Sequence, residues 1–191
     1  MPQAGERPAD FVQRMSLAKA QAAAESVGPG AFVIGADTIV AFENQIIGKP
    51  AEAREALKIL GQLRGQVHEV LTGLTVIDTT AHKMYTELVR SPVPMRVYSD
   101  AEMKAYVDSG DPLDKAGAYA IQHPDFQPVD RERFADCFAN VMGLPLCHLL
   151  RRLRPLGVEP VNNLPGMCQS FLKYDCPVFE MILKEGQTSQ T

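Results

Sequence analysis

One segment constrains the fold more than any other part of the sequence, residues 32–50, FVIGADTIVAFENQIIGKP. Phe32–Phe42 reads as a buried strand, and the Glu43-Asn44 pair turns it back into a short hairpin partner. Asp37 interrupts the apolar run, and a carboxylate there is costly unless it is hydrogen-bonded or bound to a cation. The sequence therefore predicts either an aspartate that bulges the strand and bonds to nearby backbone, or a functional carboxylate on the floor of a cleft.

Helical and strand-like patterns alternate along the rest of the chain without a strict βαβ rhythm. Helices are expected over residues 8–27, 51–65, 99–110 and 140–153, and strands over residues 67–77 and 84–97. Pro92 and Pro94 place the second of these strands at a sheet edge or a bulge. Residues 111–122 are expected to be a loop that enters a strand. Together these patterns predict an α/β fold with a mixed sheet flanked by helices.

The composition is that of a globular protein of one domain. The chain has 191 residues, of which 46% are hydrophobic and 22% charged, and its formal net charge is −4. A net acidic chain does not indicate a surface for binding a nucleic-acid polymer. No apolar run approaches the roughly 18 residues that a membrane span needs, and the first residues show no signal-peptide pattern. We therefore expect a cytoplasmic protein with neither a nucleic-acid polymer nor a membrane as partner.

The cysteines and histidines give no metal-binding or nucleophilic motif. The chain has four cysteines, Cys137, Cys147, Cys168 and Cys176. None forms a Cys-x-x-Cys pair, and the spacing of the last two is looser than that of usual zinc pairs. In a cytoplasmic chain, reduced structural thiols are expected. The four histidines are dispersed, and neither a Gly-x-Ser-x-Gly motif nor a Walker-type phosphate loop is present.

Five further polar residues are candidates for chemistry, and each has a structural alternative. Lys49 stands between a glycine and a proline, so a rigid turn would aim its ammonium group, or it is an ordinary exposed lysine. Asp114 and Lys115 are either a functional charged pair or an ion pair on a loop. Lys19 lies on an alanine-rich helix, where a solvated position is the simpler interpretation. Gln122 offers a donor and an acceptor, which suit a nucleobase edge or the end of a strand.

Six short motifs follow one another along the chain. They are LAKA (17–20), IGADTIV (34–40), IIGKP (46–50), EALKILGQLRGQVHEVLTGL (55–74), DPLDKAGAYAIQ (111–122) and ANVMGLPL (139–146). In this order they resemble the Maf family of nucleoside triphosphate pyrophosphatases, and the match covers most of residues 8–155. The resemblance implies a two-lobed fold with a central cleft. It also implies a Maf-like domain at residues 1–157, followed by a C-terminal extension at residues 158–191.

The resemblance further implies a reaction. Maf-like proteins hydrolyse nucleoside triphosphates between the α and β phosphates, releasing a monophosphate and pyrophosphate with help from a divalent cation such as Mg²⁺ or Mn²⁺. On this basis Asp37 is expected to be the acid–base residue and a metal ligand. Lys49 and Lys19 correspond to lysines that bind and neutralise the phosphates. Such a set is chemically sufficient, because phosphoryl transfer depends mainly on positioning and charge neutralisation.

The same resemblance suggests which substrate is bound. Thr38 and Gln122 match positions associated with the choice of base, and Asp114 and Lys115 are expected to contribute to substrate binding. The ADT and DKAGAYAIQ motifs are similar to those of the branch that acts on dTTP and UTP. A hydroxyl and an amide could together read the edge of a pyrimidine. A homodimer is suggested by the resemblance alone.

One family element is not found in this sequence. Maf proteins normally begin with a strand and loop of the type Leu-Ala-Ser-x-Ser-Pro-Arg-Arg, which cradles the phosphates, whereas this sequence starts shortly before the Lys19 helix. We therefore expect this chain to be weakly active or inactive as an enzyme. The alternative function is a non-catalytic regulator or binding module of cell division. The related inosine triphosphate pyrophosphatases are a third candidate, against which the ADT and GKP motifs argue.

Overall fold

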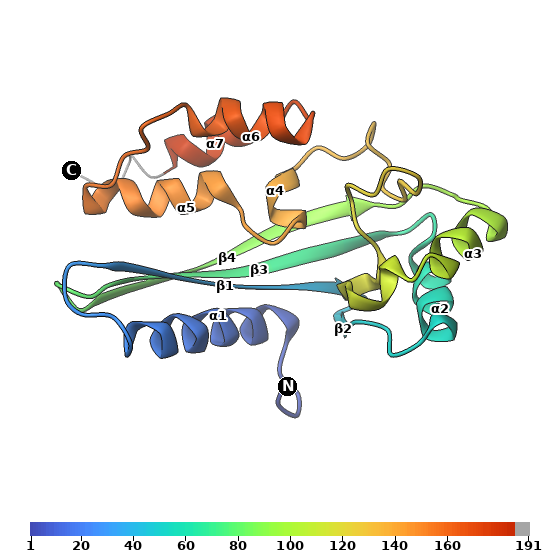
Figure 1. Cartoon of the computed structure of the whole chain (residues 1–191), viewed down its shortest axis with the longest axis horizontal. Coiled ribbons are helices and arrows are strands. Elements are labelled where there is room, and N and C mark those ends of the chain that lie inside the picture. The colour runs from blue at the N-terminus through green and yellow to red at the C-terminus, as the bar shows by residue number, and fades with distance from the viewer. Residues whose placement is uncertain (186–191) are drawn as a thin grey trace.

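A computed structural model describes residues 1–185, which are organised around one four-stranded sheet (Figure 1). The strands are β1 (Phe32–Phe42), β2 (Gln45–Ile47), β3 (Val67–Asp78) and β4 (Lys83–Pro94), in the order β2-β1-β3-β4. Every neighbouring pair in this sheet is antiparallel. The α/β architecture with flanking helices is confirmed, but the described sheet is antiparallel and not mixed.

The turns explain the strand directions. β1 and β2 are joined through Glu43 and Asn44, which both have positive φ, at 50° and 61°. Such a two-residue turn matches the twist of the flanking strands and reverses the chain at once. Residues 79–82 make a second short connection, between β3 and β4. Short connections of this kind can join only antiparallel strands, because parallel strands need a long crossover.

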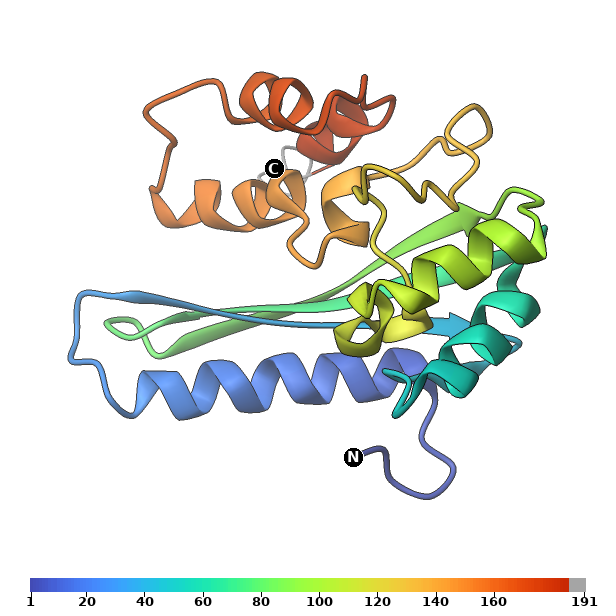
Figure 2. The ribbon, with the colours of Figure 1, turned by 45° about the vertical axis from the view of Figure 1, so that its right-hand side comes forward.

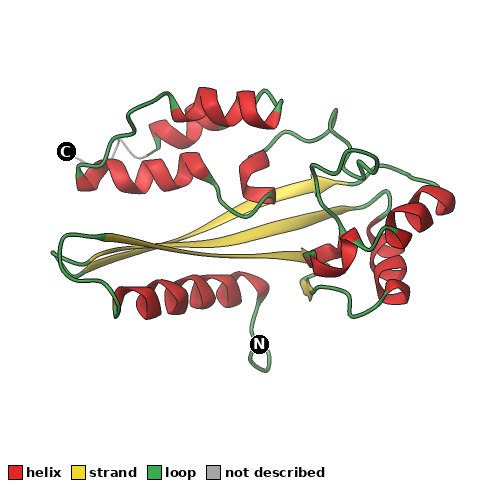
Figure 3. Cartoon of the chain, viewed as in Figure 1, coloured by secondary structure: helices red, strands yellow, loops and turns green. Residues whose placement is uncertain are grey.

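Helices cover both faces of the sheet and one of its ends (Figures 1 and 3). One face carries α1 (Pro8–Ala24), and the other carries α4 (Phe138–Val141) and α5 (Leu146–Leu153). At one end lie α2 (Ala53–Leu63) and α3 (Asp100–Asp108). The last helices, α6 (Leu164–Leu172) and α7 (Phe179–Lys184), stack above α5 in both Figure 1 and Figure 2. The layers therefore follow one another in the order α1, the sheet, α4 with α5, and α6 with α7.

Two apolar clusters hold these layers together. The smaller one lies between α1 and the sheet and contains Phe11, Val12, Ile39, Ala41 and Leu71. The larger one lies where α2 and α3 meet the strand ends, and it includes the fully buried Leu60, Leu63, Val93 and Tyr98. Burying each such side chain stabilises the fold by roughly 1.5–3 kcal/mol. The edge strand β4 carries Pro92 and Pro94, as their missing N–H groups predict.

Two predictions about local structure are wrong. Residues 111–122 do not enter a strand, because they form two short 3₁₀ turns, Asp111–Asp114 and Ala116–Ala118. The single helix expected over residues 140–153 is split into α4 and α5. Gly143 has a φ of +104° and Pro145 precedes the first turn of α5, so the helix cannot continue through this segment. By contrast, the Ser99–Glu102 capping box of α3 is confirmed.

The tail received no assignment from the sequence, and it proves to be partly helical. A third 3₁₀ turn, Arg154–Leu156, ends α5, and α6 and α7 follow. The proposed division at residue 157 stays a prediction, and residues 186–191 of the extension lie outside the described part of the chain. Within residues 1–185, none of the helices has the length and apolarity that crossing a membrane requires.

Candidate active site

The strand β1 passes through the candidate site without a bulge. Its pairing with β3 is continuous, with Asp37 opposite Gly73 and Thr38 opposite Thr72. The alternative in which Asp37 bulges the strand is therefore wrong. Because successive side chains of a strand point to opposite faces, Asp37 and Thr38 serve different faces of the sheet.

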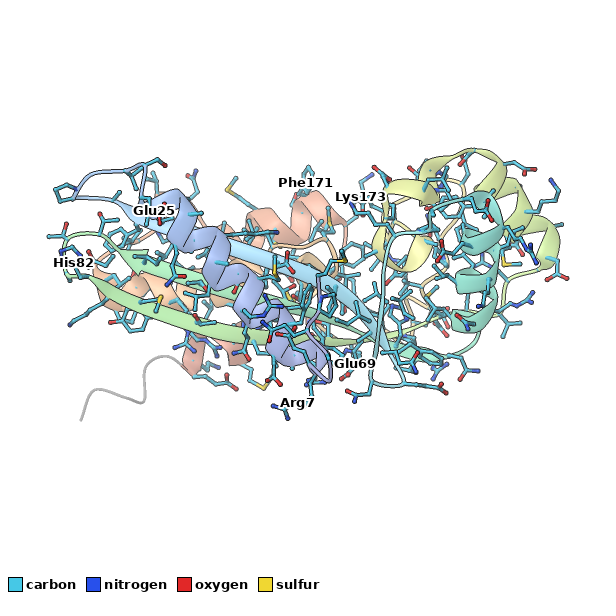
Figure 4. All side chains as sticks on the ribbon, turned by 90° about the horizontal axis from the view of Figure 1, so that it is seen from below. Arg7, Glu25, Glu69, His82, Phe171 and Lys173 are labelled. Carbon is cyan, nitrogen blue, oxygen red and sulfur yellow. The ribbon has the colours of Figure 1, made fainter. Side chains whose placement is uncertain are left out.

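The Asp37 face is covered closely by α1. A Cβ built on Gly35 would lie 2.3 Å from the Ser16 carbonyl oxygen, and one built on Gly73 would lie 2.2 Å from that of Val12. Only glycine allows the helix to approach both strands this closely. Figure 4 views α1 from below, running across the sheet between the labelled Arg7 and Glu25.

This approach brings Lys19 to Asp37. The Lys19 Nζ lies 2.5 Å from Asp37 Oδ1 and also donates to the Ala36 carbonyl at 3.3 Å. The Asp37 side chain is 16% exposed, whereas that of Lys19 is 52% exposed. The carboxylate is thus largely enclosed and paired with a cation that still faces solvent. Lys19 is more than a solvated helix residue, because it compensates the charge within the strand.

The Thr38 face opens into a pocket of about 280 Å³. Five of the predicted site residues line it, namely Thr38, Lys49, Asp114, Lys115 and Gln122. The Thr38 hydroxyl is held by the Thr72 hydroxyl at 2.8 Å and by the Gly143 carbonyl at 3.3 Å. The pocket therefore has a fixed hydroxyl on its floor and cations and an amide on its walls.

A glycine joins the two loops that form these walls. Gly117 donates its N–H to the Gly48 carbonyl at 3.2 Å, which ties the Lys115 loop to the turn that carries Lys49. Gly117 has a φ of +73°, and a Cβ there would lie 2.9 Å from a methyl group of Val40. A side chain at this position would be both strained and blocked. The AGA sequence is thus what lets the two cationic loops meet.

The charges in the pocket are only partly compensated. Lys115 Nζ lies 2.5 Å from Asp114 Oδ1 and 3.4 Å from Asp111 Oδ1. The hydrogen bond from Lys115 lowers the pKa of the exposed Asp114 carboxyl, and the nearby Lys49 lowers it further. Lys49 is exposed and, within residues 1–185, forms no ion pair. It is therefore the pocket cation that is most available to an anionic ligand.

Asp37 and Lys19 are not among the residues that line the pocket. They lie on the other side of β1, so the structure divides the predicted site into two parts. The strand β2 pairs only with residues 40–42 of β1. In the described part of the chain, residues 32–39 therefore have an unpaired edge.

The donors around Asp37 are compatible with one Mg²⁺ or Mn²⁺ ion that is shared with a substrate. Within residues 1–185 no three cysteine, histidine, aspartate or glutamate side chains are already arranged to hold a metal ion. Mg²⁺ usually binds proteins through one or two carboxylates, with the other oxygens supplied by substrate phosphates and water. The partly enclosed Asp37 carboxylate meets this requirement, whereas a dedicated protein cage is not found in the described residues.

Comparison with known proteins supplies the family. The family model described as "Maf-like protein" matches residues 1–156. The chain belongs to the Maf family. A protein of Dictyoglomus turgidum named dTTP/UTP pyrophosphatase is 43% identical over 150 residues, which cover 78% of this chain and 76% of that protein. One of the same name from Geotalea uraniireducens is 43% identical over 153 residues, covering 80% and 77% of the two chains.

A more distant relative agrees with these two. The dTTP/UTP pyrophosphatase of Dehalococcoides mccartyi is 38% identical over 159 residues, which cover 83% of this chain and 70% of that protein. The recognition of a Maf protein from its six motifs is thus confirmed.

The sequence interpretation missed several residues that build this Maf pocket. Met142 and Gly143 line it, and Tyr119 lies at its base, where its hydroxyl is 2.8 Å from the Nε2 atom of buried His68. Burial lowers the pKa of His68 to about 4, so its ring is neutral and serves packing. The ANVMGLPL motif was a usable signal for the first two residues, but it was assigned to an uninterrupted helix.

Proposed function

We propose that this Maf protein is a nucleoside triphosphate pyrophosphatase that converts dTTP and UTP to the monophosphate and pyrophosphate. The observation that carries the proposal is the pocket beside β1, which combines the Thr38 hydroxyl and the Gln122 amide with Lys49 and Lys115. The names of the relatives supply the substrate class. The non-catalytic alternative has no comparable support, because neither the described residues nor the comparisons favour it.

In this proposal the pocket holds the base and the sugar. Gln122 is exposed at the pocket rim and offers both a donor and an acceptor, which match the carbonyl and N–H edge of uracil or thymine. Thr38 contributes a hydroxyl that is already oriented by Thr72 and Gly143. A fixed hydroxyl costs little ordering entropy when the substrate binds.

The triphosphate then extends past the unpaired edge of β1. Lys49, exposed and without an ion pair in the described residues, attracts the phosphates as they leave the pocket. Lys19, half exposed and 2.5 Å from Asp37, neutralises them at the far side. Two cations along one path favour the transition state, because charge develops on the phosphate oxygens during cleavage.

Asp37 acts on the attacking water. Its carboxylate takes one proton from the water as the water oxygen bonds to phosphorus and the α–β anhydride bond breaks. The electron pair of that bond leaves with pyrophosphate, and the products together contain the atoms of the triphosphate and one water. A positioned base of this kind contributes about 10²–10⁴-fold to a rate.

A divalent cation completes the proposed chemistry. Asp37 is the residue that would hold it together with phosphate oxygens, and the ion would supply charge neutralisation and polarisation of the phosphoryl group. Two further expectations belong to the proposal, a location in the cytoplasm and a homodimer.

The test is pyrophosphate release by the full chain from separate samples of dTTP, UTP, CTP, ITP and 7-methyl-GTP, with Mg²⁺ or Mn²⁺ and with a chelator. The proposal predicts release from dTTP and UTP, with the nucleoside monophosphate as second product, and its loss in the chelator. It is contradicted if a folded chain releases inorganic phosphate in place of pyrophosphate, or cleaves the purine nucleotides best. Absence of pyrophosphate release from every triphosphate by a folded chain would also contradict the proposal.

A further inference from the structure

All four cysteines of the chain line one small cavity. Two of them belong to the family-matched residues 1–156, and two come from the segment that follows. Cys137 precedes α4, Cys147 lies in α5, Cys168 lies in α6 and Cys176 lies between α6 and α7. They meet around a cavity of about 10 Å³ where the C-terminal helices pack on the family domain. Four separate elements thus contribute one thiol each.

The cavity wall is fixed by bonds that join the two parts of the chain. Arg131 donates to the Lys173 carbonyl at 2.9 Å, and the Tyr174 hydroxyl donates to the Phe134 carbonyl at 3.0 Å. The N–H of Cys176 donates to the side-chain oxygen of Gln169 at 2.9 Å. The first two bonds hold the loop that carries Cys176 against the segment that precedes α4. The convergence of the cysteines is therefore part of the packed structure and not a chance approach of a free tail.

The thiols are close enough to influence one another. Burial raises the pKa of the Cys137 thiol to about 12, and Cys176, Cys147 and Cys168 each add to the rise, while the N–H of Asn140 opposes it. Burial likewise raises the pKa of Cys147 to about 11, again with a contribution from Cys168 and Cys176.

The other lining residues narrow the possible occupants. They are mainly apolar, including Phe138, Pro165, Leu172 and Phe179. The Gln169 oxygen already accepts the Cys176 N–H, so sulfur is the main donor that remains. Soft thiolate ligands select Zn²⁺ and iron–sulfur clusters over Mg²⁺ or Ca²⁺. A cavity of about 10 Å³ is close to the size of a single water-sized sphere, which suits one ion and not a cluster.

We propose that Cys137, Cys147, Cys168 and Cys176 form a structural site for one Zn²⁺ ion, which fastens the C-terminal helices to the Maf domain. A set of four cysteines is one of the closed, tetrahedral ligand sets of structural zinc. The thiols are not yet arranged as a ready site within residues 1–185. The four sulfur atoms must move closer together and lose their protons when the ion binds, as is usual where metal binding and folding are coupled.

The first test needs only the unmodified full chain. It is expressed with added zinc, purified with a reductant and without a chelator, and analysed for metal by mass spectrometry. The proposal predicts about one zinc per chain, and strong sulfur-to-metal charge-transfer absorption after exchange for Co²⁺. It is overturned if the folded chain, expressed with added zinc and never exposed to a chelator, contains no metal and all four of its thiols react with a thiol reagent. Iron with sulfide, or disulfides in mass spectra, would also overturn it.

Matched variants locate the ion. Cys176→Ser and Cys147→Ser each remove one ligand, from the C-terminal segment and the family domain respectively, and each is expected to abolish stoichiometric zinc. Ser170→Ala changes an exposed hydroxyl on α6 and is expected to keep the zinc. Retention of zinc in both cysteine variants would contradict the proposed ligands. If a variant fails to fold, the metal content and cobalt spectrum of the unmodified chain still decide the question.

Discussion

The nucleotide pocket and the cysteine cavity are built in opposite ways. The pocket is open, about 280 Å³ in volume, and most of its lining comes from three short stretches of the sequence, within residues 38–40, 114–122 and 141–143. The cavity is small, about 10 Å³, mostly apolar, and its four cysteines come from four separate places in the chain. A set of functional residues that belongs to sequence motifs can be recognised from the sequence. A set of residues that meets only through tertiary packing cannot be recognised in this way.

The two regions also handle charge differently. Around the pocket the charged groups are partly exposed and paired with one another, as in Lys19–Asp37 and Lys115–Asp114. In the cavity, burial keeps the Cys137 and Cys147 thiols neutral unless a cation enters. The pocket is therefore suited to exchange of a charged substrate, and the cavity to permanent retention of an ion. Substitutions should separate these two roles.

The largest effect is expected for Asp37→Asn. The substitution keeps the shape of the side chain but removes the base and a metal ligand, so pyrophosphate release should fall about 10²–10⁴-fold. The zinc content of the chain should not change. Asp108→Asn is a matched control, because Asp108 forms an equally short, 2.5 Å ion pair with Lys104 on the exposed face of α3. Equal activity of the two variants would remove Asp37 from the mechanism.

Glu87→Gln should weaken the attachment of α5, which carries Cys147. Glu87 lies in β4 and accepts from His148 at 2.7 Å, and it also pairs with Arg151 and Arg152. Burial acts to raise its pKa, but the hydrogen bonds from His148 and Arg152 lower it to about 2.

The pKa of Glu87 is lower in the folded chain than in the unfolded chain. The ionised carboxylate therefore stabilises the fold above the ordinary pKa of 4.5, and this stabilisation is lost as the pH falls toward 2. We expect the variant to lose about 3 kcal/mol of unfolding free energy at pH 7, measured by denaturant titration, and to approach the unmodified chain near pH 2. Glu69→Gln, at a half-exposed pair with Arg90, should change stability by about 1 kcal/mol or less. A Glu87 effect that does not depend on pH would contradict the ion-pair explanation.

Lys49→Ala should affect the pocket alone. Loss of a charged contact to the phosphates costs about 1.5–3 kcal/mol, so kcat/KM for dTTP should fall about 10–100-fold. Lys58 is exposed on α2 and provides the control, since Lys58→Ala should leave the kinetics unchanged. The measurement is steady-state kinetics with dTTP. A similar loss of kcat/KM in both lysine variants would indicate an effect of the overall charge of the protein and not a specific contact of Lys49.

Gly73→Ala tests the close approach of α1. The added Cβ would lie 2.2 Å from the Val12 carbonyl oxygen, so helix and strand must separate, and overpacking of this kind costs about 1–3 kcal/mol. Activity should fall too, since Lys19 moves away from Asp37. Gly61→Ala is the control, because nothing lies near its Cβ and alanine favours α2 by about 0.5–1 kcal/mol. Unchanged thermal stability of the Gly73 variant would contradict the packing described for α1.

The fold was largely predictable from the sequence where local physics decides it. The apolar run of residues 32–42, the Glu43-Asn44 turn and the Ser99 capping box each specify their own structure. Prediction failed at residues 111–122, where a strand-like sequence forms two 3₁₀ turns because Gly117 must pack against Val40 and bond to Gly48. Tertiary contact overrode local preference there.

The candidate site was predictable in its residues but not in its arrangement. Motifs identified Thr38, Lys49 and Gln122, and all three line one pocket. They could not show that Asp37 lies on the other face of β1, although the alternation of side chains along a strand contains that information. The cysteine cavity could not be found in this way, because the meeting of Cys137 with Cys176 depends on how the last helices dock.

The most direct test of the central claim is a crystal structure of the full chain with Mg²⁺ and a dTTP analogue that has a non-hydrolysable bridge between the α and β phosphates. The account predicts the base between Thr38 and Gln122, the phosphates beside Lys49, and the metal at Asp37 across the open edge of β1. A nucleotide bound elsewhere, or one whose phosphates point away from Asp37, would contradict it.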